Sequence, residues 1–310
     1  MPSFWTHAAF AWECHQLLTH LSQSGMPVGD LAHAILSNPH AFYTGMQGPD
    51  LFFFYPPTAV GKIHLSTLLH THRTADLLWT MLETATAFPE SDRPSALSYA
   101  CGFLGHYLLD TAAHPFVYAH AGTQRSVRSL CAHNALESDL DGWIARRSFG
   151  VSIRHLPRPQ SYQLTKKERR ILSSLFSQTV EKVWAIDLAP ALVGRAFVSM
   201  EIATRILYDA KGKKATLARC LERPFNCPLI SPLFLGESRY FADPANVCRR
   251  PWRDPYTGKL SHATFFALYD GALMRFLPLL GRLESSDLSP AARRLALERL
   301  CQRDFHGEPI

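Results

Sequence analysis

Two short motifs combine histidine and carboxylate side chains at helical spacing. His106, Asp110 and His114 follow one another at intervals of four residues, and His133 and Glu137 repeat that interval nineteen residues after His114. Residues four apart lie on one face of an α-helix, so each motif gathers its side chains on one face. Imidazole and carboxylate groups on facing helices form the metal sites of helical bundles, and without cysteine they suit zinc, manganese or iron. The motifs therefore predict a metal centre between two helices.

The distribution of histidines points to the same part of the chain. Twelve of the fifteen histidines lie between His7 and His133. A set of solvated histidines would be spread more evenly along the sequence. His7 lies near the start of the first expected helix. His70 and His72 could line the metal cleft, but on a long helix they are expected to be exposed.

A third feature is the carboxylate of Asp50, which lies in a Gly/Pro turn and is followed by the aromatic run of residues 52–55. Such a turn can direct Asp50 into a cavity while the aromatic side chains anchor it. The alternative is that Asp50 caps a helix and that the aromatic side chains are ordinary core. His64 follows fourteen residues later, at the start of an expected helix.

Apolar residues at helical spacing, bounded by Pro, Gly and capping residues, predict helices along most of the chain. Pro115 is expected to end one of them, and Thr165 with Glu168 forms a capping-box pattern at the start of another. No alternating strand pattern or internal repeat is evident. The expected helices span residues 6–22, 28–37, 65–87, 94–114, 124–148, 165–188, 190–209, 261–280 and 289–301, with a loop at 154–163 and an irregular stretch at 223–261.

The predicted fold class is therefore all-α, a multi-helix bundle with an interior multinuclear metal cleft. We expect a single helical domain over residues 1–310, in which residues 1–150 form the metal-binding half and residues 151–310 supply supporting helices. A hydrophobic content of 47% with 19% charged residues is typical of a globular protein with a substantial core. The net charge of +6 would favour anionic phosphate substrates or an anionic membrane surface.

Cysteine usage and the first residues suggest a location. The seven cysteines are odd in number and form no CxxC pair, which predicts free thiols in a reducing compartment. The first seven residues lack a basic segment followed by an apolar stretch, so we expect no secretory signal peptide and a cytoplasmic location. No apolar run reaches the roughly 18 residues of a membrane-spanning helix.

The order of these residues resembles the bacterial zinc-dependent phospholipase C family, whose fold is also found in fungal single-strand nucleases. The family pattern has an early His, an Asp followed fourteen residues later by a His, then HxxxD with another His, and finally HxxxE. Over roughly residues 1–140 the chain supplies it in order, with His7, Asp50 and His64, His106, Asp110 and His114, and His133 and Glu137. Members are all-helical and bind three zinc ions in a cleft.

The resemblance also implies how the ligands are shared between two to three zinc ions. The implied sets are Asp50, His64 and His106 for one zinc; His114, His133 and Glu137 for a second; and Asp110, bridging the first zinc to a third that His7 also ligates. Asp50 would in addition be the general base that takes a proton from the attacking water. The ions would bind the phosphodiester oxygens and lower the pKa of that water.

One of these ligands has a competitor in the sequence. Secreted members place the next His six residues after the Asp, whereas Asp110 and His114 are four apart. We prefer His114, because it continues the helical face, and His120 is the alternative if the helix breaks at Pro115. In secreted members the mature N-terminus also ligates the third zinc, and we expect no leader of that kind in this sequence.

The predicted function is that of a zinc-dependent phosphodiesterase, with phospholipase C-like hydrolysis of a phospholipid head-group phosphodiester by a metal-activated water. One alternative is a metal-dependent nuclease or nucleotide phosphodiesterase, and another is a non-catalytic metal-binding structural protein. The expected partners are a phospholipid or another small phosphodiester and, as a further candidate, a peripheral membrane surface. No stable nucleic-acid partner is expected.

Overall fold

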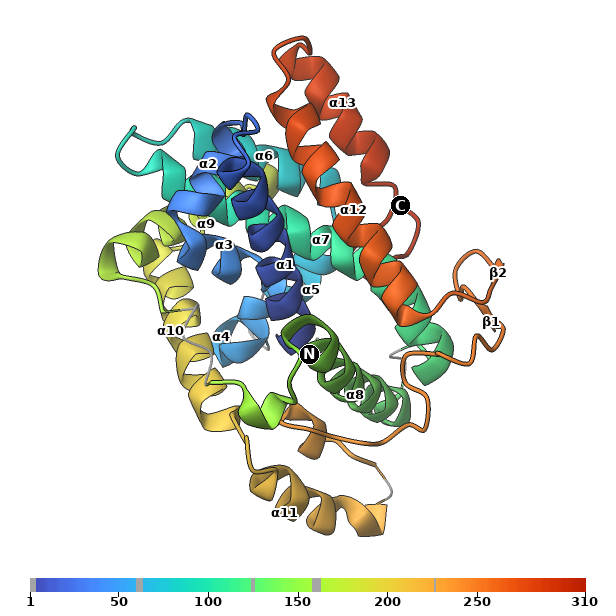
Figure 1. Ribbon diagram of the computed structural model, residues 1–310. Coiled ribbons are helices and arrows are strands. Elements are labelled where there is room, and N and C mark those ends of the chain that lie inside the picture. Colours follow the sequence, from blue (N-terminus) through green and yellow to red (C-terminus); the bar gives the residue numbers. More distant parts are fainter. Residues whose placement is uncertain (1–3, 60–63, 124–125, 158–162, 226) are drawn as a thin grey trace.

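Nearly all of the regular secondary structure is helical in the residues that the structure describes. The computed structural model describes residues 4–59, 64–123, 126–157, 163–225 and 227–310. Within these ranges the chain forms thirteen α-helices, four short 3-10 helices (η) and one antiparallel sheet of two short strands (Figure 1). The prediction of an all-α fold is confirmed.

The elements follow one another along the chain as α1 (Phe4–Gln23), α2 (Asp30–Ser37), α3 (Pro39–Gly45), η1 (Gly48–Phe54), α4 (Pro56–Ala59), α5 (Leu65–Thr71), α6 (Thr74–Thr86), α7 (Arg93–Ala121), α8 (Val127–Phe149), η2 (Ile153–His155), α9 (Lys166–Trp184), α10 (Pro190–Leu207), α11 (Lys213–Glu222), η3 (Arg223–Phe225), η4 (Ser231–Leu233), β1 (Trp252–Arg253), β2 (Leu260–Ser261), α12 (Phe265–Glu284) and α13 (Pro290–Leu300). The capping box at Thr165 and Glu168 is present at the start of α9. The expected helix start at residue 124 and half of the expected loop at 154–163 lie outside the described residues.

Helix α7 occupies the centre of the molecule, and several helices pack around it (Figure 1). It is buried along nearly its whole length of 29 residues, which is typical of a helix that is apolar on all sides. Helices α2, α3, α6, α8 and α12 all contact it. The polar side chains of its HxxxDxxxH motif are therefore held in the interior of the protein.

Helix α7 also continues through Pro115, so the prediction that it ends there is wrong. A proline inside a helix removes a backbone hydrogen bond and costs about 3 kcal/mol or more. Here the next turn is buried, because the ring of Phe116 packs against Phe265 and Trp252 at centroid distances of 5.8 and 5.5 Å. These contacts offset the cost and keep His114 on the same helical face as Asp110.

The predicted helix over 65–87 is in fact two helices. Helix α5 ends at Thr71, and α6 begins at Thr74 after Arg73, which has a φ of +53° in the left-handed region. The Arg73 side chain donates to the main-chain carbonyl of Val183 and forms an ion pair with Asp76 at 2.9 Å. These contacts stabilise a backbone conformation that non-glycine residues rarely adopt. The helical path is therefore interrupted at Arg73, between α5 and α6.

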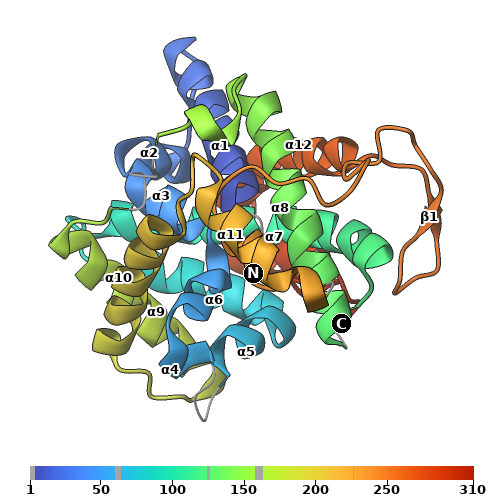
Figure 2. The same cartoon turned by 90° about the horizontal axis from the view of Figure 1, so that it is seen from below.

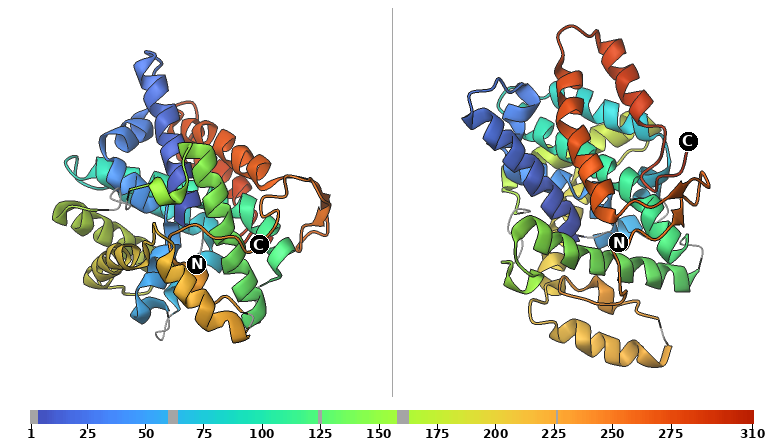
Figure 3. Two further views of the ribbon diagram at one scale, coloured as in Figure 1. Left: turned by 60° about the horizontal axis from the view of Figure 1, so that its bottom comes forward. Right: turned by 45° about the vertical axis from the view of Figure 1, so that its right-hand side comes forward.

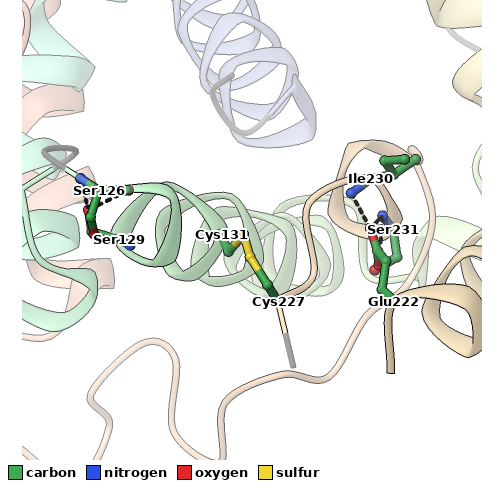
Figure 4. Close-up of a disulfide and its surroundings, with 7 residues drawn as sticks. All are labelled: Ser126, Ser129, Cys131, Glu222, Cys227, Ile230 and Ser231. Carbon is green, nitrogen blue, oxygen red and sulfur yellow. Dashed lines mark hydrogen bonds between the residues drawn. A yellow bond between two sulfur atoms is a disulfide. The ribbon is translucent and has the colours of Figure 1, made fainter. Parts of the chain in front are cut away.

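A disulfide bond joins Cys131 in α8 to Cys227 in the segment after α11 (Figure 4). The expectation that all seven cysteines are free is therefore wrong for this pair, because folding brings together two residues that are 96 apart in sequence. The other five cysteines are free. Disulfides are typical of oxidising compartments, so the cysteines give no support to a cytoplasmic location, which stays a prediction.

Helix α11 lies at the outer edge of the molecule, beyond α8 (Figures 1 and 3). It comes to the front when the molecule is seen from below (Figure 2). The segment after it returns to α8 through η4, which contacts both helices. Among the described residues, none of the helices combines the length and apolar character needed to cross a membrane.

Candidate metal centre

Three groups of buried histidines and carboxylates lie between α1, η1, α5, α7 and α8. In each group the possible ligand atoms lie within 4.8 Å of one another. Two of the groups share His106, so they form one continuous cluster. The groups are His7, Asp50 and His106; His70, His106 and Asp110; and His114, His133 and Glu137.

The first cluster forms around the two carboxylates Asp50 and Asp110. The Nε2 atom of His106 lies 2.9 Å from Asp110 Oδ2 and 3.9 Å from Asp50 Oδ2. His7 Nε2 approaches the other oxygen of Asp110 at 3.1 Å, and His70 Nε2 lies 3.2 Å from Asp50 Oδ1. All five side chains are buried. Asp110 therefore presents each of its oxygens to a different imidazole, as a bridging carboxylate would.

The second cluster comes from α7 and α8. His133 Nε2 lies 3.0 Å from Glu137 Oε1, and His114 Nε2 lies 3.7 Å from the same oxygen. His114 Nδ1 is also 3.7 Å from Asp110 Oδ2, which links the two clusters. A cavity of about 10 Å³ lies among His7, Asp110, His114 and Glu137, which is about the volume needed for one small occupant of water size.

Main-chain carbonyls orient three of the imidazole rings. The Nδ1–H group of His70 donates to Ser66 at 2.6 Å, that of His106 to Met46 at 3.0 Å and that of His114 to Phe305 at 2.6 Å. Nε2 is then the nitrogen that approaches Asp50 in His70, Asp110 in His106 and Glu137 in His114. Histidines that bind metal commonly donate their other N–H to a carbonyl or carboxylate in this way.

Six buried atoms of these clusters make no hydrogen bond of suitable geometry with the described residues, although several lie within ion-pair distance of one another. They are both carboxylate oxygens of Asp50, His106 Nε2, Asp110 Oδ2, His133 Nδ1 and Glu137 Oε2. Leaving a buried polar atom unsatisfied costs about 1–3 kcal/mol, so six in one place require an explanation. A set of nitrogen and carboxylate oxygen donors is the ligand chemistry that zinc accepts. The residues present therefore fit a zinc centre.

The charges of the clusters reinforce one another. Burial alone would raise the pKa of Asp110, but the neighbouring His106 and His114 hold it well below its usual range. Burial alone would likewise lower the pKa of His114, but Asp110 and Glu137 raise it to about 9. Despite its burial, Glu137 has a lowered pKa beside His133 and His114. Asp110 and Glu137 are therefore ionised at neutral pH, as metal ligands must be.

Asp50 is brought to the cluster by the short helix η1. Gly48, the first residue of η1, lies two positions before Asp50 and has a φ of +53°. A Cβ atom at residue 48 would lie 2.4 Å from the ring of His106. Only glycine satisfies both the backbone conformation and this close approach. The turn thus places Asp50 beside His106, which agrees with the interpretation of Asp50 as a residue directed inward rather than as a simple helix cap.

Asp141 holds the start of α1, and with it His7, against α8. Its carboxylate accepts hydrogen bonds from the main-chain N–H groups of Trp5 and Thr6 and from the Thr6 hydroxyl, at 2.8–3.0 Å. Asp139, two residues earlier on α8, accepts hydrogen bonds from the Ser238 hydroxyl and from the main-chain N–H groups of Tyr240 and Phe241. Both are buried, because α1 and the segment around residue 240 cover this face of α8.

The structure places seven of the eight predicted ligands in these groups and adds one residue. His7, Asp50, His106, Asp110, His114, His133 and Glu137 all belong to them. His64 does not: it is exposed at the N-cap of α5, and its role as a ligand stays a prediction. His70, expected to be exposed, is buried and contacts Asp50 instead.

His120, the competitor of His114, lies outside the groups. It is exposed, its Nδ1 donates to the Phe116 carbonyl, and its ring packs near Trp252. The continuation of α7 through Pro115 accounts for this difference, because it keeps His114 on the inward face. Residues 1–3 lie outside the described part of the chain, so the structure describes no N-terminal ligand.

The last ten residues of the chain cover one side of the centre, a position that the sequence motifs do not predict. Phe305 accepts the hydrogen bond from His114, and its own N–H donates to the main-chain carbonyl of His70 at 3.0 Å. The ring of His306 lies parallel to that of His70, with centroids 5.4 Å apart. No spacing rule connects these residues to motifs nearly 200 positions earlier.

Comparison with known proteins gives one family. A family model described as zinc dependent phospholipase C matches residues 5–189, which is more than half of the chain. No curated protein and no solved structure gives a significant match. The matched range contains all the residues of the three groups but not the C-terminal segment that covers them.

Proposed function

Because the chain belongs to the zinc-dependent phospholipase C family, we propose that it hydrolyses the phosphodiester bond that joins a phospholipid head group to diacylglycerol. Water attacks the phosphorus atom and the bond from phosphorus to the glycerol oxygen breaks. The products are diacylglycerol, which takes up a proton, and the phosphate monoester of the head group. The observation that carries this proposal is the set of six unsatisfied ligand atoms in two linked, buried clusters.

Two to three zinc ions are proposed as the cofactor, held by His7, Asp50, His70, His106 and Asp110 on one side and by His114, His133 and Glu137 on the other. Bound zinc would stabilise negative charge on the phosphodiester oxygens and make water more acidic.

The chain's own residues then have distinct roles. Asp50 is the proposed general base, because both of its oxygens lack hydrogen bonds within the described residues and either can receive a proton from the attacking water. His106 lies between the two aspartates and fixes their separation. Asp110 stays ionised beside two imidazoles and holds His7 and His106 in place. The burial of these groups excludes bulk water and strengthens their electrostatic effect.

The experiment that tests the proposal is product identification with zinc-loaded protein and phosphatidylcholine. Phosphorus NMR is expected to show phosphocholine, with an equal amount of diacylglycerol by chromatography. Asp50→Asn should abolish turnover, whereas Asp187→Asn, which changes an exposed aspartate, should not. Faster hydrolysis of a dinucleotide or of single-stranded DNA would favour a nuclease, and zinc binding without turnover of either substrate would favour a structural role.

The substrate also calls for contact with a lipid surface, and α11 offers one. Leu217, Leu221 and Phe225 form what we term the α11 apolar face, with exposed fractions of 65%, 69% and 80%. Lys211, Lys213 and Arg223 flank it and have no ion pair within the described residues.

A helix that combines exposed apolar and basic side chains is typical of binding to an anionic bilayer surface. We therefore propose that the α11 apolar face docks on anionic phospholipid. The disulfide from Cys227 to Cys131 attaches this region to α8, which carries His133 and Glu137 (Figure 4). Docking would thus bring the metal-binding helix to the surface that holds the substrate.

A further inference from the structure

The C-terminal segment Asp304–Gly307 packs beside the metal centre in a defined conformation. The Asp304 carboxylate accepts hydrogen bonds from the N–H groups of His306 and Glu308, both at 2.9 Å. Gly307 has a φ of +78°, and a Cβ atom there would lie 2.7 Å from the Pro115 ring. The segment is therefore held in one conformation against α7, although it lies more than 100 residues beyond the family match.

His306 is the residue of this segment that lies between the two metal-binding clusters. Its ring is 5.4 Å from that of His70 in one cluster and 5.7 Å from that of His114 in the other. It is not a member of any of the three ligand groups. His70 and His114 are 3% and 6% exposed, whereas His306 is only partly buried. His306 thus lies on the solvent side of both clusters.

One nitrogen of His306 is occupied and the other is available. Nδ1 lies 2.7 Å from the hydroxyl group of Tyr118. Nε2 has no hydrogen bond to the described residues. Tyr118 itself is buried and stacks on His114 at a centroid distance of 5.4 Å, so it holds the His306 ring at a fixed place relative to the second cluster.

We propose that Tyr118 donates to Nδ1 of His306, and that the Nε2–H group of His306 donates a hydrogen bond to a phosphate oxygen of the substrate. This inference rests on the proposed function, because it takes the ligand to be a phosphodiester or phosphate monoester at the metal centre. A neutral imidazole with its acceptor nitrogen bound by a hydroxyl is a fixed N–H donor. His306 and Tyr118 therefore form a phosphate-binding subsite outside the family-matched region, in which Tyr118 is a positioning residue.

The test measures zinc content and the affinity of the zinc-loaded protein for inorganic phosphate by titration calorimetry. A hydrogen bond to a charged group corresponds to about a tenfold or greater change in affinity. His306→Ala should therefore weaken phosphate binding at least about tenfold while zinc content is unchanged. His306→Gln, which keeps an N–H donor, should recover part of this loss. Tyr118→Phe should weaken binding by a smaller factor.

The control is Glu308→Gln, which changes an exposed side chain two residues away and should leave the affinity unchanged. With phosphatidylcholine, His306→Ala should raise KM more than it lowers kcat. Unchanged phosphate affinity in His306→Ala would overturn the inference, as would loss of zinc, which would assign His306 to the metal instead. A wild-type protein that holds zinc but neither binds phosphate nor cleaves phosphodiesters would refute the proposed function itself.

Discussion

The imidazole of His114 donates its Nδ1–H to the main-chain carbonyl of Phe305 at 2.6 Å, across 191 positions of sequence. This contact directs Nε2 of His114 toward Glu137 and ties the end of the chain to the helix that carries the HxxxDxxxH motif. The metal centre is therefore completed by a segment that the family match does not include. The N-terminal helices supply the candidate ligands, and the C-terminal segment orients one of them.

His70, rather than His64, should be required for metal binding. His70 is buried with its Nε2 atom 3.2 Å from Asp50, whereas His64 is exposed. His70→Ala should lower the zinc content by about one ion per chain, because it removes one of the few ligands of a tetrahedral site. His64→Ala should leave zinc content close to that of the wild type. The two variants form a matched pair, and the reverse result would restore the ligand set implied by the sequence resemblance.

Zinc binding to protein stripped of metal by a chelator should release protons at neutral pH. Asp110 and Glu137 raise the pKa of His114 to about 9 in spite of burial, so its imidazole is protonated below that pH. Zinc needs the neutral imidazole and must displace this proton. Apparent zinc affinity should therefore rise with pH up to about 9, by at most about tenfold per pH unit for a single proton.

Calorimetry in two buffers of different ionisation enthalpy measures the number of protons released. His114→Gln removes the titrating group and should reduce that number by about one at pH 7. Equal proton release by the wild type and this variant would contradict the assignment of the raised pKa to His114.

The disulfide between Cys131 and Cys227 should stabilise the fold. It closes a loop of 96 residues, and native disulfides typically contribute about 2–4 kcal/mol to the free energy of unfolding. Cys227→Ser should lower the denaturant midpoint accordingly. The control is Cys220→Ser, which changes a free, exposed cysteine on α11 and should have little effect. Equal midpoints for all three proteins would show that the bond does not contribute.

The α11 apolar face should govern binding to anionic vesicles. Burying one leucine side chain contributes about 1.5–3 kcal/mol, so Leu217→Ser combined with Leu221→Ser should weaken co-sedimentation with phosphatidylserine-containing vesicles at least about tenfold. Binding should also weaken as salt is raised, because Lys211, Lys213 and Arg223 contribute electrostatically. Met274→Ser, an exposed apolar residue on α12, serves as the control. Equal loss in the control would mean that no particular face docks.

Local rules predict most of the helices and most of the candidate ligands. The intervals of four residues in His106–Asp110–His114 and His133–Glu137 determine which side chains share a helical face, and the structure keeps both faces inward. The burial of His70 is not predicted, because the apolar pattern indicates one continuous helix over residues 65–87 in place of α5 and α6. Thr74 followed by the acidic Asp76 is a helix-start signal that marks the break at Arg73.

Other features depend on contacts that spacing does not encode. The continuation of α7 through Pro115 is stabilised by side chains from residues 252 and 265. The hydrogen bonds from Trp5 and Thr6 to Asp141 and the disulfide to Cys227 also form between distant parts of the chain. His306 reaches the centre only after the whole helical bundle has formed, so its place could not be inferred from its neighbours in sequence.

The most direct measurement is the metal content of the purified, unsupplemented protein by inductively coupled plasma mass spectrometry. The wild type should contain about two to three zinc ions per chain, the number that the two linked clusters can share. His106→Ala and Glu137→Ala, each of which removes a buried ligand of one cluster, should both lower that number, whereas His155→Ala, an exposed histidine outside the clusters, should not. A wild-type protein that holds no zinc, even after zinc is added back, would contradict the metal centre and the activity proposed for it.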